Sequence, residues 1–389
     1  MDKQIVIQSI ASASALGDSV TTALESLNSS TVSTKQVVLH DKNYPVFPLH
    51  PEAESSLQAF LKTNVKYRKL DRTAQLAMLV AEKCFNQTST PDAEWVINAG
   101  SSRGATHLWE EFHKEFIEGN NVPVKSSPLT TLGNISSNIS QHLKLRSFQI
   151  DHSITCSSGL QALANGYAWL LSGLADHFMA VGTEAPLTVF TIAQMAALGI
   201  YSQQANEYPC KPCWKNPEKK NTFALGEAAI AIALTQKKPY KGDIIIAGMG
   251  TASEVTPTPT SISLYGDAFR LSMEKAISKA AITKDEIDLI IPHSPGTYQG
   301  DKAEYNAIQG IFEKNTPWVF NHKYLTGHTL GASGLLSVEL GYLLLQNNLR
   351  PEFPYPSLYQ SAHKEKVASV LINSMGFGGN AVSILLKKI

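Results

Sequence analysis

Four short motifs carry the groups that could do chemistry in this chain, and the first contains a cysteine at a turn. Cys156 lies in the run Ser-Ile-Thr-Cys-Ser-Ser-Gly, directly before apolar residues at helical spacing, among them Leu160, Leu163 and Tyr167. This pattern predicts a strand, a sharp turn and a helix. Unpaired N–H groups and the dipole at the helix N-terminus favour a thiolate, the nucleophilic form of cysteine. We therefore expect Cys156 to be a nucleophile, while the residue alone leaves a packed core cysteine as the alternative.

Two histidines and a glycine-rich turn follow in the second half of the chain. His293 ends an aliphatic stretch, and His328 lies in the glycine-rich segment 327–334. The run Gly376-Phe377-Gly378-Gly379 precedes an apolar stretch and fits both a plain tight turn and a functional one. Taken singly, such histidines more often cap or pack than catalyse. A nucleophilic role for Cys156 would give all of these motifs a common purpose.

Composition bounds the class of protein. The chain has 389 residues with 33 basic and 33 acidic side chains, and 43% of its residues are hydrophobic, which fits one large α/β unit or two or three domains. Balanced charge argues against a dedicated binder of nucleic acid or of a membrane surface, because both need a basic excess. The sequence has no signal-peptide pattern and no apolar run of about 18 residues, so we expect a cytoplasmic protein.

The remaining cysteines give no sign of a disulfide framework or of a metal site. Four cysteines are too few for such a framework in a chain of this length. Cys210 and Cys213 form a Cys-Lys-Pro-Cys pair, but no second pair has metal-ligand spacing and no βαβ pattern precedes it. We interpret the pair as loop packing and predict no metal.

The order of strand and helix patterns repeats once along the chain. The matched segments are 5–7 with 244–252, 71–85 with 269–280, 95–100 with 289–293, and 155–171 with 327–345. Four elements that recur in the same order predict two similar α/β halves, joined at a polar stretch with Pro and Gly near residues 235–243. We place the first half, with the cysteine, at residues 1–238 and the second, with both histidines, at 239–389.

With this organisation, the chain resembles the β-ketoacyl-[acyl carrier protein] synthases, the condensing enzymes of the thiolase superfamily. The resemblance covers almost the whole chain. Its motifs are Thr-Cys-Ser-Ser-Gly at 155–159, His293-Ser-Pro-Gly-Thr-Tyr-Gln-Gly-Asp-Lys-Ala-Glu304, Lys323-Tyr-Leu-Thr-Gly-His328 and Asn373-Ser-Met-Gly-Phe-Gly-Gly379. It implies the thiolase fold, in which two α/β halves stack in five αβαβα layers. The helices predicted at 160–171 and 335–345 would lie in the middle layer, and both are apolar nearly all round, as burial requires.

The resemblance also implies a reaction. An acyl chain would move from the phosphopantetheine thiol of an acyl carrier protein to Cys156 as a thioester, and malonyl-carrier would lose CO₂ and attack it. His293 and His328, both neutral, would donate hydrogen bonds to the malonyl thioester carbonyl. The backbone N–H groups of Cys156 and Phe377 would form the oxyanion hole for the acyl carbonyl. No cofactor is expected beyond the carrier's phosphopantetheine.

The resemblance gives supporting roles to a second set of residues. Lys323 would either adjust the electrostatics of the site or have a structural role, in a polar network with Glu304. Thr297 would contact pantetheine. The other supporting residues are Asp301, Gly376 and Gly378. His152 and His322 carry no motif, and we interpret them as surface or packing residues.

Three departures from the family pattern favour a specialised pathway over housekeeping fatty-acid synthesis. The segment His293-Ser-Pro-Gly-Thr replaces His-Gly-Thr-x-Thr, Ser337 stands where fatty-acid enzymes commonly have glutamate, and Lys211-Pro-Cys-Trp replaces Arg-Pro-Phe-Asp. We expect a specialised fatty-acid, polyketide, aryl-polyene or flexirubin-like pigment system.

Two other functions on the same fold stay open. One is a non-condensing partner subunit similar to chain-length factors; the retained Cys156, His293 and His328 speak against it, although Pro295 and Ser337 leave room for it. The other is a thiolase, which would need a further cysteine after the glycine turn that this sequence lacks. Family members are usually dimers, so the expected partners are an acyl carrier protein and a second subunit, either identical or related.

Overall fold

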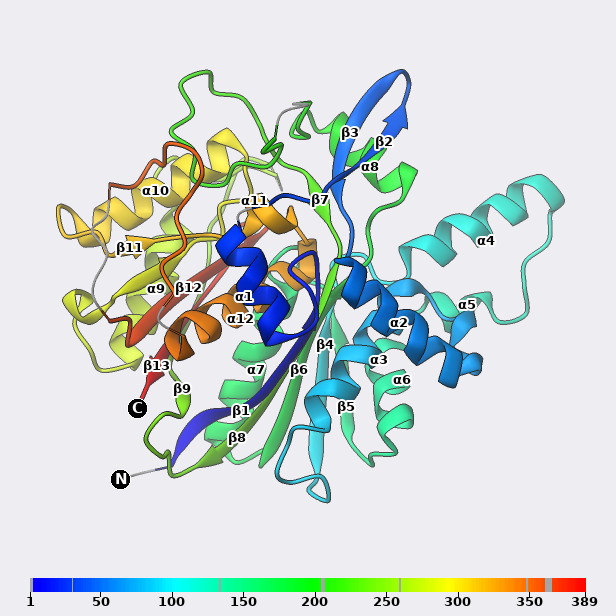
Figure 1. Ribbon diagram of the computed structural model, residues 1–389, viewed down its shortest axis with the longest axis horizontal. Helices are drawn as coiled ribbons and strands as arrows, with labels where there is room; N and C mark the ends of the chain where they lie inside the picture. Colours follow the sequence, from blue (N-terminus) through cyan, green and yellow to red (C-terminus); the bar gives the residue numbers. More distant parts are fainter. Residues whose placement is uncertain are drawn as a thin grey trace.

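Two five-stranded sheets, which join along one edge into a continuous ten-stranded sheet, form the framework of the protein (Figure 1). The structure is a computed structural model that describes residues 3–29, 31–132, 134–203, 207–258, 260–347, 349–360 and 366–389. In strand order, the first sheet comprises β5 (Phe148–His152), β4 (Trp95–Gly100), β6 (His177–Glu184), β8 (Ala228–Lys237) and β1 (Gln4–Ala13). The second comprises β9 (Ile244–Ser253), β13 (Asn380–Lys388), β12 (Ser369–Gly376), β10 (Leu289–Ile291) and β11 (Trp318–Val319).

The two sheets have the same internal arrangement. In the first sheet, β8 lies between β1 and β6 and pairs antiparallel with both. In the second sheet, β13 lies between β9 and β12 and likewise pairs antiparallel with both. The two remaining strands of each sheet are added in parallel. The sheets meet where Val6 of β1 lies opposite Ile245 of β9. The repeat expected from the sequence is therefore present: both halves have the same order and the same directions of strands. The chain passes from one sheet to the other between Lys237 and Ile244, and the division at residues 238 and 239 remains a prediction.

Helices lie between the sheets and on both outer faces, which gives the five expected layers. The middle layer holds α7 (Ser158–Ser172) and α12 (Ser333–Gln346), whose leucines share one core with the inner faces of both sheets. The outer layers hold α3 (Arg72–Phe85) with α6 (Asn134–Leu143) on one side, and α9 (Asp267–Lys279) with α10 (Tyr298–Phe312) on the other. Each outer layer closes a separate apolar core, because strands buried on both faces need a cover on each.

The middle helices can approach closely because glycines line their contact. A Cβ on Gly159 of α7 would lie 2.6 Å from the carbonyl oxygen of Gly331, and one on Gly334 would lie 2.6 Å from Leu160 Cβ. Glu339 of α12 accepts a hydrogen bond from Ser12 of β1. The expectation of helices that are apolar nearly all round is confirmed.

A small sheet and further helices complete the fold. A small sheet joins β2 (Lys35–Leu39), β3 (Lys42–Phe47) and β7 (Leu225–Gly226). The other helices are α1 (Val20–Ser29), α2 (Pro51–Thr63), η1 (Val65–Lys69), α4 (Thr106–Gly119), α5 (Ser126–Thr130), α8 (Val189–Ala197), η2 (Lys284–Glu286), α11 (Lys323–Thr326) and η3 (Leu330–Ala332). Within the described ranges, no helix has the length and apolar character needed to cross a bilayer.

Most of the predicted elements are found, with different lengths. The helix expected at 71–85 is α3, which Asp71 caps by accepting a hydrogen bond from Thr73 N at 2.8 Å. The opening strand is longer than expected, and β10 ends at Ile291. Pro292 and His293 therefore belong to a loop, which frees the histidine from the sheet.

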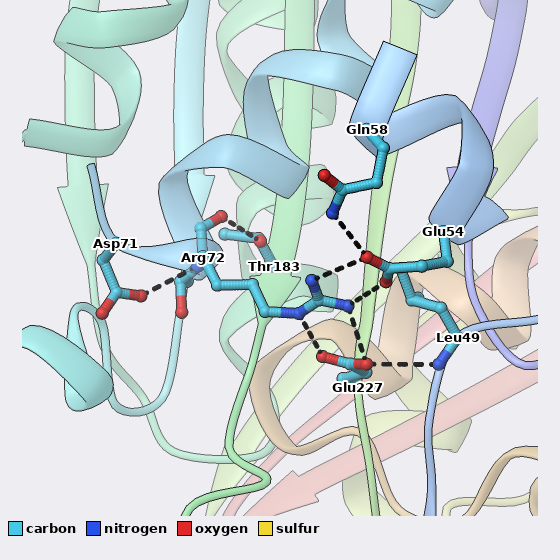
Figure 2. A network of polar contacts seen from close by, with 8 residues as sticks. Leu49, Glu54, Gln58, Asp71, Arg72, Thr183 and Glu227 are labelled. Atoms are coloured by element: carbon cyan, nitrogen blue, oxygen red, sulfur yellow. Dashed lines mark hydrogen bonds and ion pairs between the residues drawn. The ribbon is translucent and has the colours of Figure 1, made fainter. Parts of the chain in front are cut away.

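An ion-pair network fixes the segment that precedes β8 (Figure 2). Arg72 donates to both carboxylate oxygens of Glu227, at 2.8 and 3.0 Å, and to Glu54 at 2.6 Å. The Leu49 N–H also donates to Glu227, at 3.2 Å. Glu227 directly follows β7, so this network holds β7 against the N-terminal part of the chain.

We predict that Arg72→Met lowers the free energy of unfolding by about 2 kcal/mol, because it leaves the buried Glu227 carboxylate without its cation. Chemical denaturation measures the change. Lys114→Met is the control, since Lys114 and Glu118 form an exposed pair, and it should change stability by less than about 0.5 kcal/mol. Equal effects of the two substitutions would contradict a stabilising role for the network.

Candidate active site

Cys156 lies in a tight elbow between β5 and α7. Thr155 has a φ of +48°, and the Ser157 and Ser158 N–H groups bond the carbonyls of Ile154 and Thr155, both at 3.2 Å. The helix itself begins at Ser158, two residues after the cysteine. The expected turn with the thiol just before the helix is present.

His328 is held in a single ring orientation. Its Nδ1 accepts a hydrogen bond from the Leu330 N–H at 2.9 Å, so the neutral ring carries its proton on Nε2. Its backbone bonds to the β7 segment, through Ala224 O at 2.7 Å and Gly226 N at 3.1 Å. Gly327, with a φ of +61°, is packed so closely that a Cβ would lie 2.6 Å from Phe47. Both the backbone conformation and the close packing therefore require glycine directly before His328.

His293 is positioned through its peptide groups. Its N–H and that of Ser294 each donate to Glu304, at 2.8 Å, and the Lys323 ammonium donates to the His293 carbonyl. Asn373 donates to the same carboxylate at 3.0 Å. The expected network of Lys323 and Glu304 therefore acts through the histidine backbone. Among the described residues, His293 Nδ1 has no hydrogen-bond partner.

One cavity of about 420 Å³ brings the thiol and both imidazoles together. The rings of His293 and His328 are 5.3 Å apart between centroids and nearly perpendicular, at 82°. Other predicted site residues that line the cavity are Thr297, Gly376 and Phe377. Lys323, Glu304, Asp301 and Gly378 are not among the residues that line it.

The two predicted oxyanion-hole residues, Cys156 and Phe377, come from segments in close contact. A Cβ on Gly376 would lie 1.9 Å from Thr155 Oγ1 and 2.6 Å from Ile154 O. Ser374 Oγ donates to the Cys156 carbonyl at 3.3 Å. Gly378 has a φ of +85°, which turns the chain after Phe377. Glycine at 376 is required by space, and glycine at 378 by conformation.

Burial sets the protonation states of the site. It lowers the pKa of both His293 and His328 well below the usual value, with the charge of Lys323 acting in the same direction, so both rings are neutral. Burial, reinforced by the charge of Glu184, raises the pKa of the Cys156 thiol to about 12. Burial thus acts against the thiolate that the helix terminus was expected to favour, and the nucleophilic role of Cys156 stays a prediction.

Asp301, Cys210 and Cys213 lie outside the lining of the cavity. Asp301 accepts hydrogen bonds from Gly296 N at 3.0 Å and Cys213 N at 2.9 Å, and burial raises its pKa to about 7. Cys210 and Cys213 are free and pack into different apolar clusters, as expected for loop packing. Across the described segments, no group of three His, Cys, Asp or Glu side chains could hold a metal ion.

Sequence reasoning missed Glu184 and underestimated His152. Glu184 ends β6, and its buried carboxylate accepts four hydrogen bonds beside the site. His152 Nε2 lies 3.0 Å from the Ser158 carbonyl at the start of α7, and its Nδ1 lies 3.0 Å from Asn98 Nδ2. Both residues are polar and end a strand, and this position in the sequence could have marked them as candidates.

Comparison with known proteins identifies the family. The family model for the N-terminal domain of beta-ketoacyl synthases matches residues 4–239, and that for the C-terminal domain matches residues 244–354. The chain belongs to the beta-ketoacyl synthase family. The resemblance seen in the motifs is thereby confirmed, and with it the class of acyltransferase-type condensing enzymes.

Individual relatives agree with this assignment. The 3-oxoacyl-[acyl-carrier-protein] synthase 2 of Coxiella burnetii is 25% identical over 419 residues, which cover 100% of this chain and 99% of that protein. A chain from the AntDE:AntF structure, a type II polyketide acyl-carrier protein in complex with its ketosynthase bound to the hexaketide, is 16% identical with a TM-score of 0.84 and full coverage of both chains. The ketosynthase ApeO with its chain length factor ApeC from Xenorhabdus doucetiae gives 22% identity and a TM-score of 0.82, covering 100% of this chain and 98% of that one. The expected thiolase fold of ketosynthases is confirmed.

We predict that Gly376→Ala slows acylation of Cys156 about 100-fold, because the added methyl group must displace the elbow that carries the thiol. The rate is measured by intact mass after mixing with an acyl donor. Gly310→Ala in α10 is the control: the nearest atom to its new methyl group would be 4.0 Å away, so acylation should be unchanged and stability should rise by up to about 1 kcal/mol. Normal acylation by the Gly376 variant would contradict the close packing.

The buried histidines predict a pH dependence of stability. Below pH 6.5 the unfolded chain binds a proton at position 328 that the folded protein does not bind, so this residue makes stability fall as the pH falls. His328→Gln should reduce the slope of unfolding free energy against pH, between about 5 and 6, by about 1.4 kcal/mol per pH unit. Denaturant titrations at several pH values give the slope. Identical slopes for the variant and the wild type would show that the ring is protonated in the folded state.

Proposed function

We propose that this protein catalyses the decarboxylative condensation of malonyl-carrier with an acyl chain held on Cys156. The observation that carries the proposal is the single cavity shared by the Cys156 thiol and the His293 and His328 rings. An acyl carrier protein would deliver both substrates on phosphopantetheine. The similar AntDE:AntF structure, which contains an acyl-carrier protein in complex with its ketosynthase, supports this choice of partner.

In the first step, the Cys156 sulfur attacks the acyl thioester carbonyl and the carrier thiol leaves. Because the resting thiol is protonated, its proton must pass to a base and then to the departing thiolate, so the step is balanced. Both nitrogens of His328 are committed, one as acceptor from Leu330 N and one as the carrier of the proton. The His293 ring lines the same cavity as the thiol, and we assign the proton transfer to its Nε2, because its Nδ1 is fully buried.

In the second step, malonyl-carrier loses CO₂ and its thioester carbonyl gains negative charge. The Nε2–H of His328 is fixed by the Leu330 contact and can donate to that oxygen without reorganisation. The resulting carbanion attacks the acyl thioester, and the N–H groups of Cys156 and Phe377 receive the charge on its oxygen. Collapse of this intermediate expels the Cys156 sulfur as a thiolate and releases the β-ketoacyl-carrier; the thiolate then takes up one proton from solvent, which restores the resting thiol.

We further propose that the pathway is a specialised one, such as a polyketide or aryl-polyene system. The support is the local chemistry of the His293 loop. Pro295 lines the cavity where the family usually has a hydroxyl, and the Ser294 side chain is turned toward Glu304, with its Oγ at 3.3 Å from the carboxylate. Thr297 is then the remaining hydroxyl of this motif at the cavity wall. A second subunit, identical or related, would complete the assembly.

We predict that incubation with an acyl-carrier adds the acyl mass to the wild-type protein and not to Cys156→Ala. Cys84→Ala is the matched control, since Cys84 lies in the outer core of the first half, and it should be acylated normally. Subsequent addition of malonyl-carrier should give the β-ketoacyl-carrier, detected by mass.

The outcomes separate the candidate functions. Acylation without elongation would favour a non-condensing partner subunit, and use of coenzyme-A esters alone would favour a thiolase-type enzyme. Restoration of ordinary fatty-acid elongation in a strain that lacks its own condensing enzyme would contradict the specialised pathway.

A further inference from the structure

Residues with unfavourable backbone conformations lie next to the Cys156 thiol and the two imidazoles of the site. Thr155, Ser294 and Leu330 all have positive φ, at +48°, +24° and +42°, and each lies within two residues of Cys156, His293 or His328. Non-glycine residues rarely adopt such angles, and a β-branched residue does so only at a cost in stability. Thr155 is therefore the most costly of the three.

The Thr155 side chain carries a second cost. Its hydroxyl is buried and has no hydrogen-bond partner in the part of the chain that the structure describes. An unpaired buried hydroxyl destabilises the folded state, whereas alanine at this position would avoid that cost. A residue that is unfavourable in both backbone and side chain suggests a function other than stability.

The position of this side chain indicates the function. Thr155 Oγ1 lies against Gly376, at only 1.9 Å from the point that a Cβ would occupy. Thr155 immediately precedes Cys156, and Gly376 immediately precedes Phe377. The side chain is thus wedged between the two segments whose next N–H groups form the proposed oxyanion hole.

We propose that Thr155 is a positioning residue that sets the separation of the Cys156 and Phe377 N–H groups. The inference rests on the proposed function, because it requires an oxyanion. On one side of the wedge, Ser374 Oγ holds the Cys156 carbonyl at 3.3 Å. On the other, Ile154 O faces Gly376. With these contacts in place, the bulk of the threonine side chain keeps the end of β12 at a fixed distance from the elbow.

The test compares two reactions of the same thiol. Acylation by a thioester passes through an oxyanion, whereas alkylation by iodoacetamide is a direct displacement at carbon and forms none. Thr155→Ala removes the wedge, and Thr155→Val keeps its shape without the hydroxyl. Ala281→Gly is the control, because Ala281 is an exposed residue with a φ of +52° outside the cavity lining.

For Thr155→Ala we expect acylation by acyl-carrier to slow at least about 10-fold through kcat, with KM and the alkylation rate unchanged. Its melting temperature should not fall, since the unpaired hydroxyl is removed and alanine, which is not β-branched, adopts the positive φ at a lower cost than threonine. Thr155→Val should acylate at close to the wild-type rate, and Ala281→Gly should match the wild type in both reactions.

Three results would overturn the inference: wild-type acylation by Thr155→Ala, equal slowing in the valine and alanine variants, or parallel loss of acylation and alkylation. They differ from a failure of the proposed function, in which the wild-type protein itself would take no acyl group from a carrier.

Discussion

The carboxylate of Glu184 is the interaction on which the geometry of the site depends. It accepts hydrogen bonds from Ser101 Oγ at 2.8 Å, from the N–H groups of Ser102 and Arg103 at 2.7 and 3.0 Å, and from Gly331 N at 2.8 Å. Glu184 belongs to the sheet of the first half, whereas Gly331 lies three residues after His328. A buried carboxylate without these donors would be strongly destabilising, so the contact fixes the two halves in a single relation.

The same burial explains the electrostatics of the site. Two neutral imidazoles and a thiol whose pKa is raised by burial share the cavity, and the negative charge of Glu184 makes a thiolate still less favourable. Hydrogen-bond donors are stronger and better oriented in such surroundings than in water. The site therefore suits a reaction in which charge develops on substrate oxygens and disappears again, more than one that keeps a charged nucleophile at rest.

The sequence predicted what depends on periodicity and local turn chemistry. The strand–turn–helix around Cys156, the capped helix at 72–85 and the repeated order of elements follow from such patterns. The sequence could not predict what depends on burial and on contacts between residues far apart in the chain. Burial raises the pKa of the Cys156 thiol, and Ser374 of β12, more than 200 residues away in sequence, donates to the Cys156 carbonyl. The carboxylate of Glu304 supports His293 through two peptide N–H groups. Neither contact can be predicted from the spacing of residues in the sequence. The roles of individual site residues remain predictions for the same reason.

The most direct measurement of the central claim is a crystal structure of the protein after reaction with an acyl-carrier thioester. The account predicts an acyl group on Cys156 Sγ, with its carbonyl oxygen within hydrogen-bonding distance of the N–H groups of Cys156 and Phe377, and with the His328 Nε2 facing the space beside it. An acyl group on another side chain, or a carbonyl oxygen directed away from both N–H groups, would contradict it.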